Sequence, residues 1–169
     1  MTMRMVFAGC LALLAAVGAG AQTKTSGTLK CDKPEPVYSI EVGDRPGHAM
    51  LLEKSACSWT QGLAIGSDKA KEGTNVATVE VTARRGVGNG AHVSTMESGD
   101  KFFVSYRYIS PMKDGKPGET SGKWSYTGGT GKLKGVKGGG TFKVTFGQDG
   151  TSTAEVEGEY TLAGEQTKK

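Results

Sequence analysis

His92 and Ser94 are spaced as a base and its nucleophile could be. Residues two apart in a strand share one face of a sheet, so the two side chains would lie side by side. Acyl transfer also needs a third group that orients the histidine, and geometry rather than sequence position identifies that group. No Gly-x-Ser-x-Gly turn surrounds Ser94. The sequence therefore assigns no catalytic residue.

Both histidines also share a predicted strand face with a methionine, His48 with Met50 and His92 with Met96. Imidazole and thioether ligands together suit copper in an exported protein. A metal site usually needs three or four ligands, however, and each pair supplies two. The hairpin register given below also places His92 on the outer face. We therefore expect no metal and no cofactor.

Two glycine-rich stretches invite comparison with nucleotide-binding loops. Residues 128–132 read Gly-Gly-Thr-Gly-Lys, but Leu133 follows where a P-loop needs Ser or Thr. Residues 86–91 match Gly-x-Gly-x-x-Ala. Both motifs hold phosphate at the N-terminus of a helix, and neither stretch precedes a helical pattern. Nucleotide binding is therefore not expected.

The charged residues are dispersed along the chain, whose formal net charge is +4 at pH 7. The single basic cluster is Lys132, Lys134 and Lys137, which we interpret as a solvated loop. A nucleic-acid-binding protein would concentrate its basic residues, so no nucleic-acid partner is expected. The acidic residues Glu155, Glu157 and Glu159 alternate onto one strand face. We interpret them as edge protection rather than as a glycosidase pair.

The first 21 residues read as a secretory signal peptide. Arg4 supplies the positive start, Met5 to Ala19 is an apolar run, and small residues precede Gln22. The run is about 15 residues, and a membrane span needs about 20. The sequence predicts a cleaved segment at 1–21 and a barrel domain at 22–169 with an ordered core at 26–163. The protein would be periplasmic or secreted, with no membrane segment after processing.

Removal of Cys10 with this segment leaves two cysteines, Cys31 and Cys57. In an exported protein two cysteines usually pair. A bridge across this loop would stabilise the fold by about 3.5 kcal/mol. A metal-binding pair and two free thiols are the alternatives, and the exported context favours the disulfide.

The elements that must position these side chains are strands. Turn signals recur at short intervals, and 27 of the 169 residues are glycine, which is typical of an all-β sandwich or barrel. Apolar and polar residues alternate with a period of two, so one face of each strand is buried. About eight strands are expected, the number that closes a small antiparallel barrel. The predicted strands include 26–31, 37–42, 48–53, 58–65, 76–83, 91–96, 101–109 and 152–162, and the glycine-rich run 124–142 joins two more; polar loops are predicted at 66–74 and 114–118.

Two turns fix a predicted register. A two-residue turn at Ser98-Gly99 would pair Glu97 with Asp100 and put Val93 opposite Val104 inside the barrel. A three-residue turn at 148–150, with a left-handed glycine at its end, would set the register of the last hairpin. The first turn places on the outer face His92, Ser94 and Met96, with Phe103 among their neighbours. The second pairs Val144 with Ala154 and Phe142 with Val156.

Aromatic residues dominate the predicted inner face. They are either plain core packing or the lining of a cavity for a small molecule, because an eight-stranded barrel can be filled or can hold one ligand. The candidate lining residues are Phe102, Val104, Tyr106, Tyr108, Trp124, Tyr126, Phe142, Val144 and Tyr160.

The segment from Tyr126 to Gly138, Tyr-Thr-Gly-Gly-Thr-Gly-Lys-Leu-Lys-Gly-Val-Lys-Gly, resembles the glycine-rich segment of the allene oxide cyclase and dirigent barrels. It is also similar to small exported bacterial proteins built on that barrel. The resemblance implies an eight-stranded antiparallel barrel with an apolar cavity. The cyclase's catalytic groups lie outside this segment, so none is carried over. The glycines that carry the resemblance are Gly128, Gly129, Gly131, Gly135 and Gly138.

The sequence thus predicts a monomeric, exported, disulfide-bonded barrel that is not an enzyme and binds a small apolar molecule. One alternative is a cyclase- or isomerase-like enzyme that uses the same cavity. The other is an inhibitor or envelope scaffold that acts through its outer surface, and the predicted outward position of Phe103 is the hint for it.

Overall fold

The computed structural model describes residues 22–163, so the predicted signal peptide and Cys10 lie outside the described residues. The described chain consists of strands and one short 3-10 helix. In chain order these elements are β1 (Thr23–Cys31), β2 (Val37–Glu41), β3 (Ala49–Gln61), β4 (Ala64–Ile65), β5 (Asp68–Val81), β6 (Arg85–Met96), β7 (Lys101–Lys113), β8 (Lys116–Pro117), β9 (Thr120–Gly129), η1 (Gly131–Leu133), β10 (Lys137–Phe146) and β11 (Ser152–Thr161).

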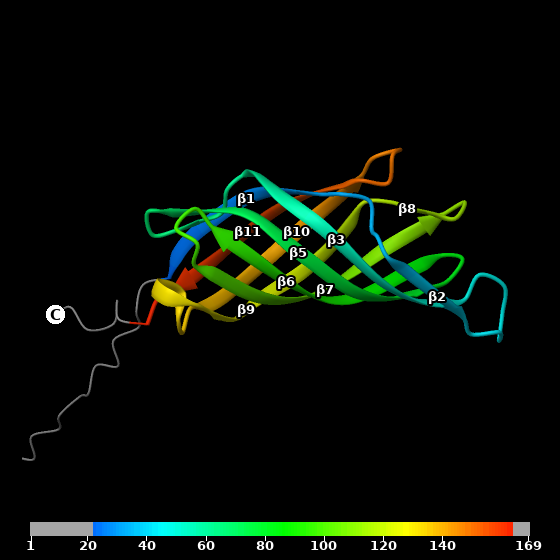
Figure 1. The fold of residues 1–169 in the computed structure, drawn as a ribbon. Coiled ribbons are helices and arrows are strands. Elements are labelled where there is room, and N and C mark those ends of the chain that lie inside the picture. The colour runs from blue at the N-terminus through cyan, green and yellow to red at the C-terminus, as the bar shows by residue number, and fades with distance from the viewer. Residues whose placement is uncertain (1–21, 164–169) are drawn as a thin grey trace, which may run out of the picture.

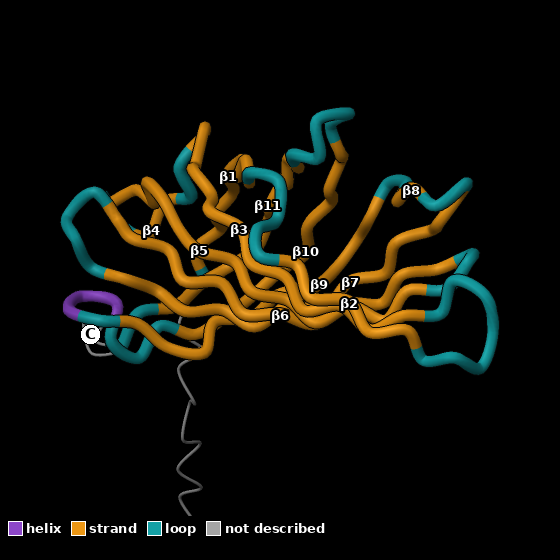
Figure 2. The backbone as a smooth tube through the Cα atoms, turned by 45° about the vertical axis from the view of Figure 1, so that its right-hand side comes forward, coloured by secondary structure: helices purple, strands orange, loops and turns teal. Residues whose placement is uncertain are grey.

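Eight of these strands close into an antiparallel barrel (Figures 1 and 2). The sheet runs β3-β1-β11-β10-β9-β7-β6-β5, and β5 then pairs with β3 to complete the ring. Alternation of apolar and polar side chains lets each strand bury its apolar face inside the barrel. Closure gives each strand two neighbours for its backbone hydrogen bonds and leaves no open edge. The all-β, eight-stranded antiparallel prediction is confirmed.

One end of the barrel is filled by side chains. The turn between β9 and β10 folds beneath this end and carries η1, at the left of Figure 1. Its backbone is fastened to β7, since Thr130 N–H donates to Lys101 O and Lys101 N–H donates to Thr130 Oγ1, both at 2.8 Å. The buried cluster here comprises Leu63, Ile65, Ala70, Met96, Phe102, Val104, Trp124, Tyr126, Leu133, Val136 and Tyr160.

The predicted disulfide is confirmed. Cys31 on β1 and Cys57 on β3 are directly opposed, with Cα atoms 4.0 Å apart. They lie in the β1–β3 interface, the shortest of the eight, which pairs residues 28–31 with residues 57–61 and contains a register shift. The bridge therefore fastens the barrel where backbone pairing contributes least.

The last hairpin has the predicted register. Gly147 N–H donates to Thr151 O, and Gly150 adopts a φ of 84° at the end of the three-residue turn. Val144 pairs with Ala154 and Phe142 with Val156, so their apolar side chains meet inside the barrel.

The predicted register of the β6–β7 hairpin is wrong by one residue. Met96 N–H donates to Asp100 O, so the turn contains Glu97, Ser98 and Gly99 rather than two residues. Gly99 takes the left-handed conformation with φ 91°, as in a three-residue turn. A shift of one residue moves every side chain to the opposite face. The inward residues of β6 are therefore His92, Ser94 and Met96, paired with or next to Val104 and Phe102.

Other boundaries also differ from prediction: β1 begins at Thr23 rather than at 26, where the ordered core was expected to begin, and β6 begins at Arg85 rather than at 91. The strands expected at 48–53 and 58–65 form one continuous strand, β3, followed by the short β4. The expected loop 66–74 is mostly the start of β5, which pairs with both β3 and β6. Its polar residues face solvent while Ala70 faces the core, so composition hid the strand. The expected loop 114–118 contains the two-residue strand β8.

Glycines on β6 make room for the tyrosines of β7. Gly88 and Gly90 face inward, and the rings of Tyr108 and Tyr106 lie over them. A Cβ atom at Gly88 would come within 2.2 Å of the Tyr108 ring, and one at Gly90 within 2.1 Å of Tyr106 Oη. The Gly-x-Gly pattern at 86–91 is thus a packing feature of a strand and precedes no helix.

The disulfide yields a prediction about stability. The bridge closes a sequence separation of 26 residues, so the Cys31→Ala/Cys57→Ala variant should lose about 3.5 kcal/mol of unfolding free energy in urea. As a control, reductant should destabilise the wild-type protein and leave the variant unchanged. Equal stabilities of the two proteins would contradict a structural bridge.

The glycine–tyrosine packing yields a second prediction, with a matched control on the same face of β6. Gly88→Ala should cost about 2 kcal/mol in urea unfolding, because the new methyl group overlaps the Tyr108 ring. Gly86→Ala should change stability by less than about 1 kcal/mol, because its Cβ would meet Ser110 Cβ at an ordinary 3.6 Å. Equal costs at both positions would show that the backbone, and not the ring, disfavours alanine.

Candidate functional site

A cavity of about 150 Å³ lies inside the barrel. It occupies the part of the interior beyond the filled end and reaches the surface beside Phe146, which is 42% exposed. Side chains from all eight barrel strands meet around it. Its lining residues are Leu29, Cys31, Glu53, Trp59, Leu63, Asn75, His92, Phe102, Val104, Tyr106, Tyr108, Thr120, Trp124, Phe142, Val144, Phe146, Ser152, Ala154 and Val156.

Seven of the nine candidate lining residues border this cavity, and two do not. Tyr126 and Tyr160 lie deeper, in the filled end. Tyr126 packs edge-on against Phe102 with ring centroids 5.5 Å apart, and Tyr160 Oη accepts a hydrogen bond from Gly66 N–H at 2.7 Å. Both tyrosines therefore help to close the barrel. The seven that border the cavity are Phe102, Val104, Tyr106, Tyr108, Trp124, Phe142 and Val144.

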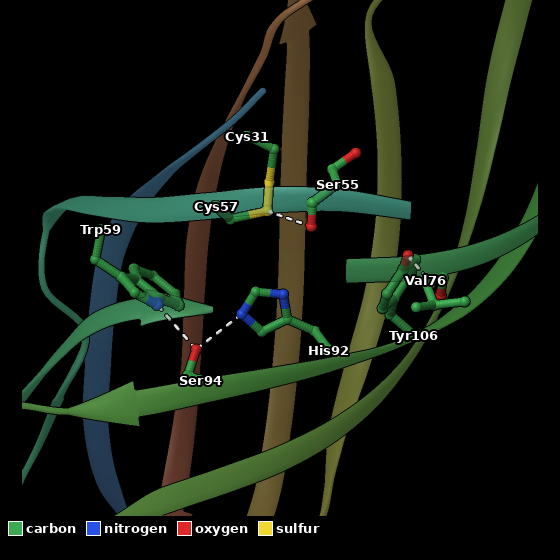
Figure 3. Close-up of a disulfide and its surroundings, with 8 residues drawn as sticks. All are labelled: Cys31, Ser55, Cys57, Trp59, Val76, His92, Ser94 and Tyr106. Carbon is green, nitrogen blue, oxygen red and sulfur yellow. Dashed lines mark hydrogen bonds between the residues drawn. A yellow bond between two sulfur atoms is a disulfide. The ribbon is translucent and has the colours of Figure 1, made fainter. Parts of the chain in front are cut away.

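Trp59 and His92, which line the cavity, are joined through the buried Ser94 in a hydrogen-bonded chain (Figure 3). The Trp59 indole N–H donates to Ser94 Oγ at 2.9 Å, and Ser94 Oγ lies 2.8 Å from His92 Nε2. The sequence had paired His92 with Ser94, but on the outer face. The chain exists because the one-residue register shift turns both inward, toward Trp59 of β3.

The hydrogen bonds around His92 favour one tautomer of its neutral ring. Trp59 can only donate, so Ser94 accepts there and must place its own hydrogen elsewhere. The sole acceptor within reach among the described residues is His92 Nε2. A proton on Nδ1 satisfies this chain best, because a proton on Nε2 would leave both the Ser94 hydroxyl hydrogen and Nδ1 unpaired. Residues 22–163 offer Nδ1 no partner. Burial lowers the pKa of His92 to about 4, so the ring is neutral at physiological pH.

This arrangement does not favour a serine nucleophile. Ser94 is fully buried and does not border the cavity, so a substrate held there would not meet its oxygen. The Trp59 N–H also occupies a lone pair of that oxygen. No carboxylate in the described chain orients His92 Nδ1. The chain instead holds the His92 and Trp59 rings in place as part of the wall.

A second polar group lies nearer the mouth of the cavity. It comprises Glu53 on β3, Asn75 on β5, and Tyr106 and Tyr108 on β7, all of which line the cavity. Burial raises the pKa of Glu53. Burial, and less strongly the charge of Glu53, raises the pKa of both tyrosines, while a hydrogen bond with Asn75 partly offsets this at Tyr106. The phenols are therefore protonated.

The sequence analysis missed Glu53, Asn75 and Trp59. The alternation that places Cys57 inside the barrel could have identified two of them, because Glu53 and Trp59 lie on the same face of β3. The prediction split β3 into two strands and so lost this continuity. Asn75 was missed because the start of β5 was taken for a loop.

The other candidate chemistries fall elsewhere. His48 lies between Asp44 and Glu80, with Nδ1 2.5 Å from Asp44 Oδ1 and Nε2 3.1 Å from Glu80 Oε1. Met50 points from the outer face and is 44% exposed. No cluster of three or more His, Cys, Asp or Glu side chains suited to a metal occurs within residues 22–163.

The glycine-rich segment forms the turn at the filled end rather than a phosphate site. Gly128, Gly131, Gly135 and Gly138 have positive φ angles, and strand β10 follows the three-residue η1. Gly131 has no room for a side chain, because a Cβ atom there would overlap the Asp100 carboxylate. That carboxylate accepts a hydrogen bond from Lys132 N–H at 3.0 Å.

The outer surface carries exposed apolar side chains on the β2–β3 hairpin. Tyr38 and Ile40 of β2 are opposed to Leu52 and Met50 of β3, and all four are at least 44% exposed. Phe103, the outward residue noted in the sequence, is only half-exposed and packs beside Gly128. The exposed Glu155 and Glu157 lie on the outer face of β11, as their alternation predicts.

The described part of the chain contains no helix with the length and apolarity needed to cross a membrane. No protein-family model and no curated protein matches the chain. Among solved structures, the chain is similar to a DUF3224-family protein of unknown function from Shewanella oneidensis MR-1. The two are 17% identical with a TM-score of 0.46, over 85% of this chain and 98% of the other. The barrel assignment rests on the strand pairing above and not on this likeness.

The buried His92 yields a prediction about pH. The unfolded chain takes up a proton near the ordinary pKa of 6.5, and the folded chain only near pH 4. Stability is therefore lost as the pH falls through this window, by about 2 kcal/mol between pH 7.5 and pH 5, and the loss levels off below pH 4.

Urea unfolding at a series of pH values would measure this loss. His92→Gln should remove about 2 kcal/mol of the pH dependence, because glutamine does not titrate. His48→Gln is the control and should retain that part of the slope. If wild-type and His92→Gln slopes coincide, His92 is not buried in its neutral form.

Proposed function

We propose that this protein binds a small, largely apolar molecule inside the barrel. The observation that carries the proposal is the cavity of about 150 Å³ with its aromatic and aliphatic lining. A buried apolar cavity of roughly this volume is large enough to bind benzene. The proposal thus favours a ligand of one ring with a short substituent.

Packing alone does not account for this interior. The filled end shows that these strands can close a core, since Leu133 and Val136 are only 3% exposed there. Toward the mouth, the inner positions of β11 carry the small side chains of Ser152 and Ala154, and no loop side chain of residues 22–163 fills the space beside them. A filled core would place larger residues at such positions, because voids forfeit contact energy.

A cyclase- or isomerase-like enzyme is the second candidate, and a specific observation favours it. Glu53 lines the cavity with a raised pKa, and Tyr106 and Tyr108 line it too, although the Tyr106 hydroxyl donates to Val76 O at 3.5 Å. An ionisable group with a shifted pKa in an apolar pocket is a common property of catalytic sites. The resemblance of residues 126–138 to allene oxide cyclase and dirigent barrels agrees with this candidate. It supplies no catalytic residue, because fold does not fix function.

Export is also part of the proposal. The apolar segment at 1–21 is suited to cleavage before Gln22, and the Cys31–Cys57 bridge suits an oxidising compartment. We therefore place the working protein in the periplasm or outside the cell, as a monomer.

Intrinsic fluorescence tests the binding proposal directly. The chain has two tryptophans, Trp59 and Trp124, and both line the cavity. Titration with toluene or a similar one-ring compound should therefore produce a saturable change in emission. Ala154→Phe should weaken binding at least tenfold, because the added ring occupies the cavity. Thr153→Phe, on the other face of β11, should bind as the wild type does.

Native mass spectrometry of protein purified from its own compartment would complement this titration. A stoichiometric compound that leaves on denaturation would identify the ligand. If no one-ring compound binds saturably while circular dichroism shows an intact barrel, the proposal is contradicted. That result would favour a scaffold that acts through the exposed apolar side chains of the β2–β3 hairpin.

A further inference from the structure

The cavity, which we proposed above to bind a small apolar molecule, has an acidic side chain on its wall. Glu53 is the one carboxylate among its described lining residues, and no lysine or arginine is among them. His92, the one histidine that lines the cavity, is neutral. Within the described chain, the wall therefore offers one carboxyl group and no positive charge.

Glu53 has no cationic partner within the described chain. It forms no ion pair with any side chain of residues 22–163, whereas the exposed Glu119 pairs with Lys143. Burial alone raises its pKa, and no neighbouring positive charge counteracts that effect. A half-buried carboxylate in this position is costly unless a cation or a hydrogen-bond donor approaches it.

Aromatic rings line the same cavity as Glu53. Tyr106 and Tyr108 are stacked with centroids 6.2 Å apart and an interplanar angle of 21°. The hydroxyl end of each ring covers a glycine of β6, and both residues line the cavity. Phe142 stands edge-on to Tyr106 at 5.9 Å. The electron-rich faces of such rings attract organic cations, with ammonium groups held in aromatic cages as the familiar use.

We propose that the cavity binds a small organic ammonium ion, with its charged head at Glu53 beside Tyr106 and Tyr108 and its apolar body in the aromatic interior. An anionic ligand would meet the Glu53 carboxylate without any compensating positive charge. A neutral ligand of the same shape would fill the space and leave Glu53 unpaired. The ammonium ion satisfies both the apolar wall and the single charge.

Two probes of the same shape separate charge from hydrophobicity. Benzyltrimethylammonium and neopentylbenzene differ only in the quaternary atom, which is nitrogen in one and carbon in the other. At pH 8, tryptophan fluorescence should show the ammonium compound binding about tenfold more tightly than neopentylbenzene. Phenylacetate should bind most weakly of the three.

Variants locate the selectivity. Glu53→Gln should abolish the tenfold preference and keep neopentylbenzene binding, which also shows that the variant folds. Glu72→Gln, an exposed carboxylate on the outer face of β5, should keep the preference. Tyr108→Leu should reduce the preference and leave part of it, because Glu53 remains.

The outcomes distinguish this inference from the proposal on which it rests. Equal or tighter binding of neopentylbenzene by the wild-type protein would overturn the ammonium inference while supporting an apolar binding site. A preference that survives Glu53→Gln would also overturn it. Absence of binding by all three probes to a folded barrel would overturn both.

Discussion

Closure of the sheet between β1 and β3 is the constraint on which the rest of the structure depends. Every other barrel interface is a longer pairing, whereas this one joins residues 28–31 to 57–61 and contains a register shift. The disulfide lies within it and compensates for the few backbone hydrogen bonds. Without this seam the sheet would have two open edges, and the inner face would be a groove open to water.

Within the closed ring, the distribution of small and large inner residues separates the filled end from the hollow part. At the filled end, large side chains from the strands meet Leu133 and Val136 from the β9–β10 turn. Toward the mouth, glycines on β6 lie under tyrosines, and Ser152 and Ala154 on β11 leave space opposite them. The cavity thus results from which residues face each other across the barrel rather than from the number of strands alone.

Much of the fold, and less of the site, can be predicted from the sequence. The alternation of β7 and β11 and the turn at 148–150 predict their faces and register correctly, because Gly150 takes the conformation that this turn requires. The turn at Ser98-Gly99 was harder. A two-residue turn of the favoured type needs positive φ at both positions, and serine at the first does not suit it.

The prediction of the site failed because the predicted register of the β6–β7 hairpin was wrong by one residue. His92 lines the cavity, with Ser94 behind it, only in the observed pairing. Glu53 and Trp59 line the same cavity because β3 is continuous. Contacts between distant strands decide which polar residues meet, and local pattern does not contain that information. The polar stretch at 66–74 shows the same limit, since pairing on both sides makes it a strand despite its composition.

The glycine–tyrosine pairs on β6 and β7 have a consequence for the evolution and redesign of this barrel. Each ring occupies the volume that its glycine lacks, so positions 88 and 108 form one structural unit, as do positions 90 and 106. A larger residue at either glycine is compatible with the barrel only if the facing ring shrinks at the same time. Related barrels should therefore change these positions in concert, and a designer who wishes to reshape the cavity must exchange volume across the two strands as a pair.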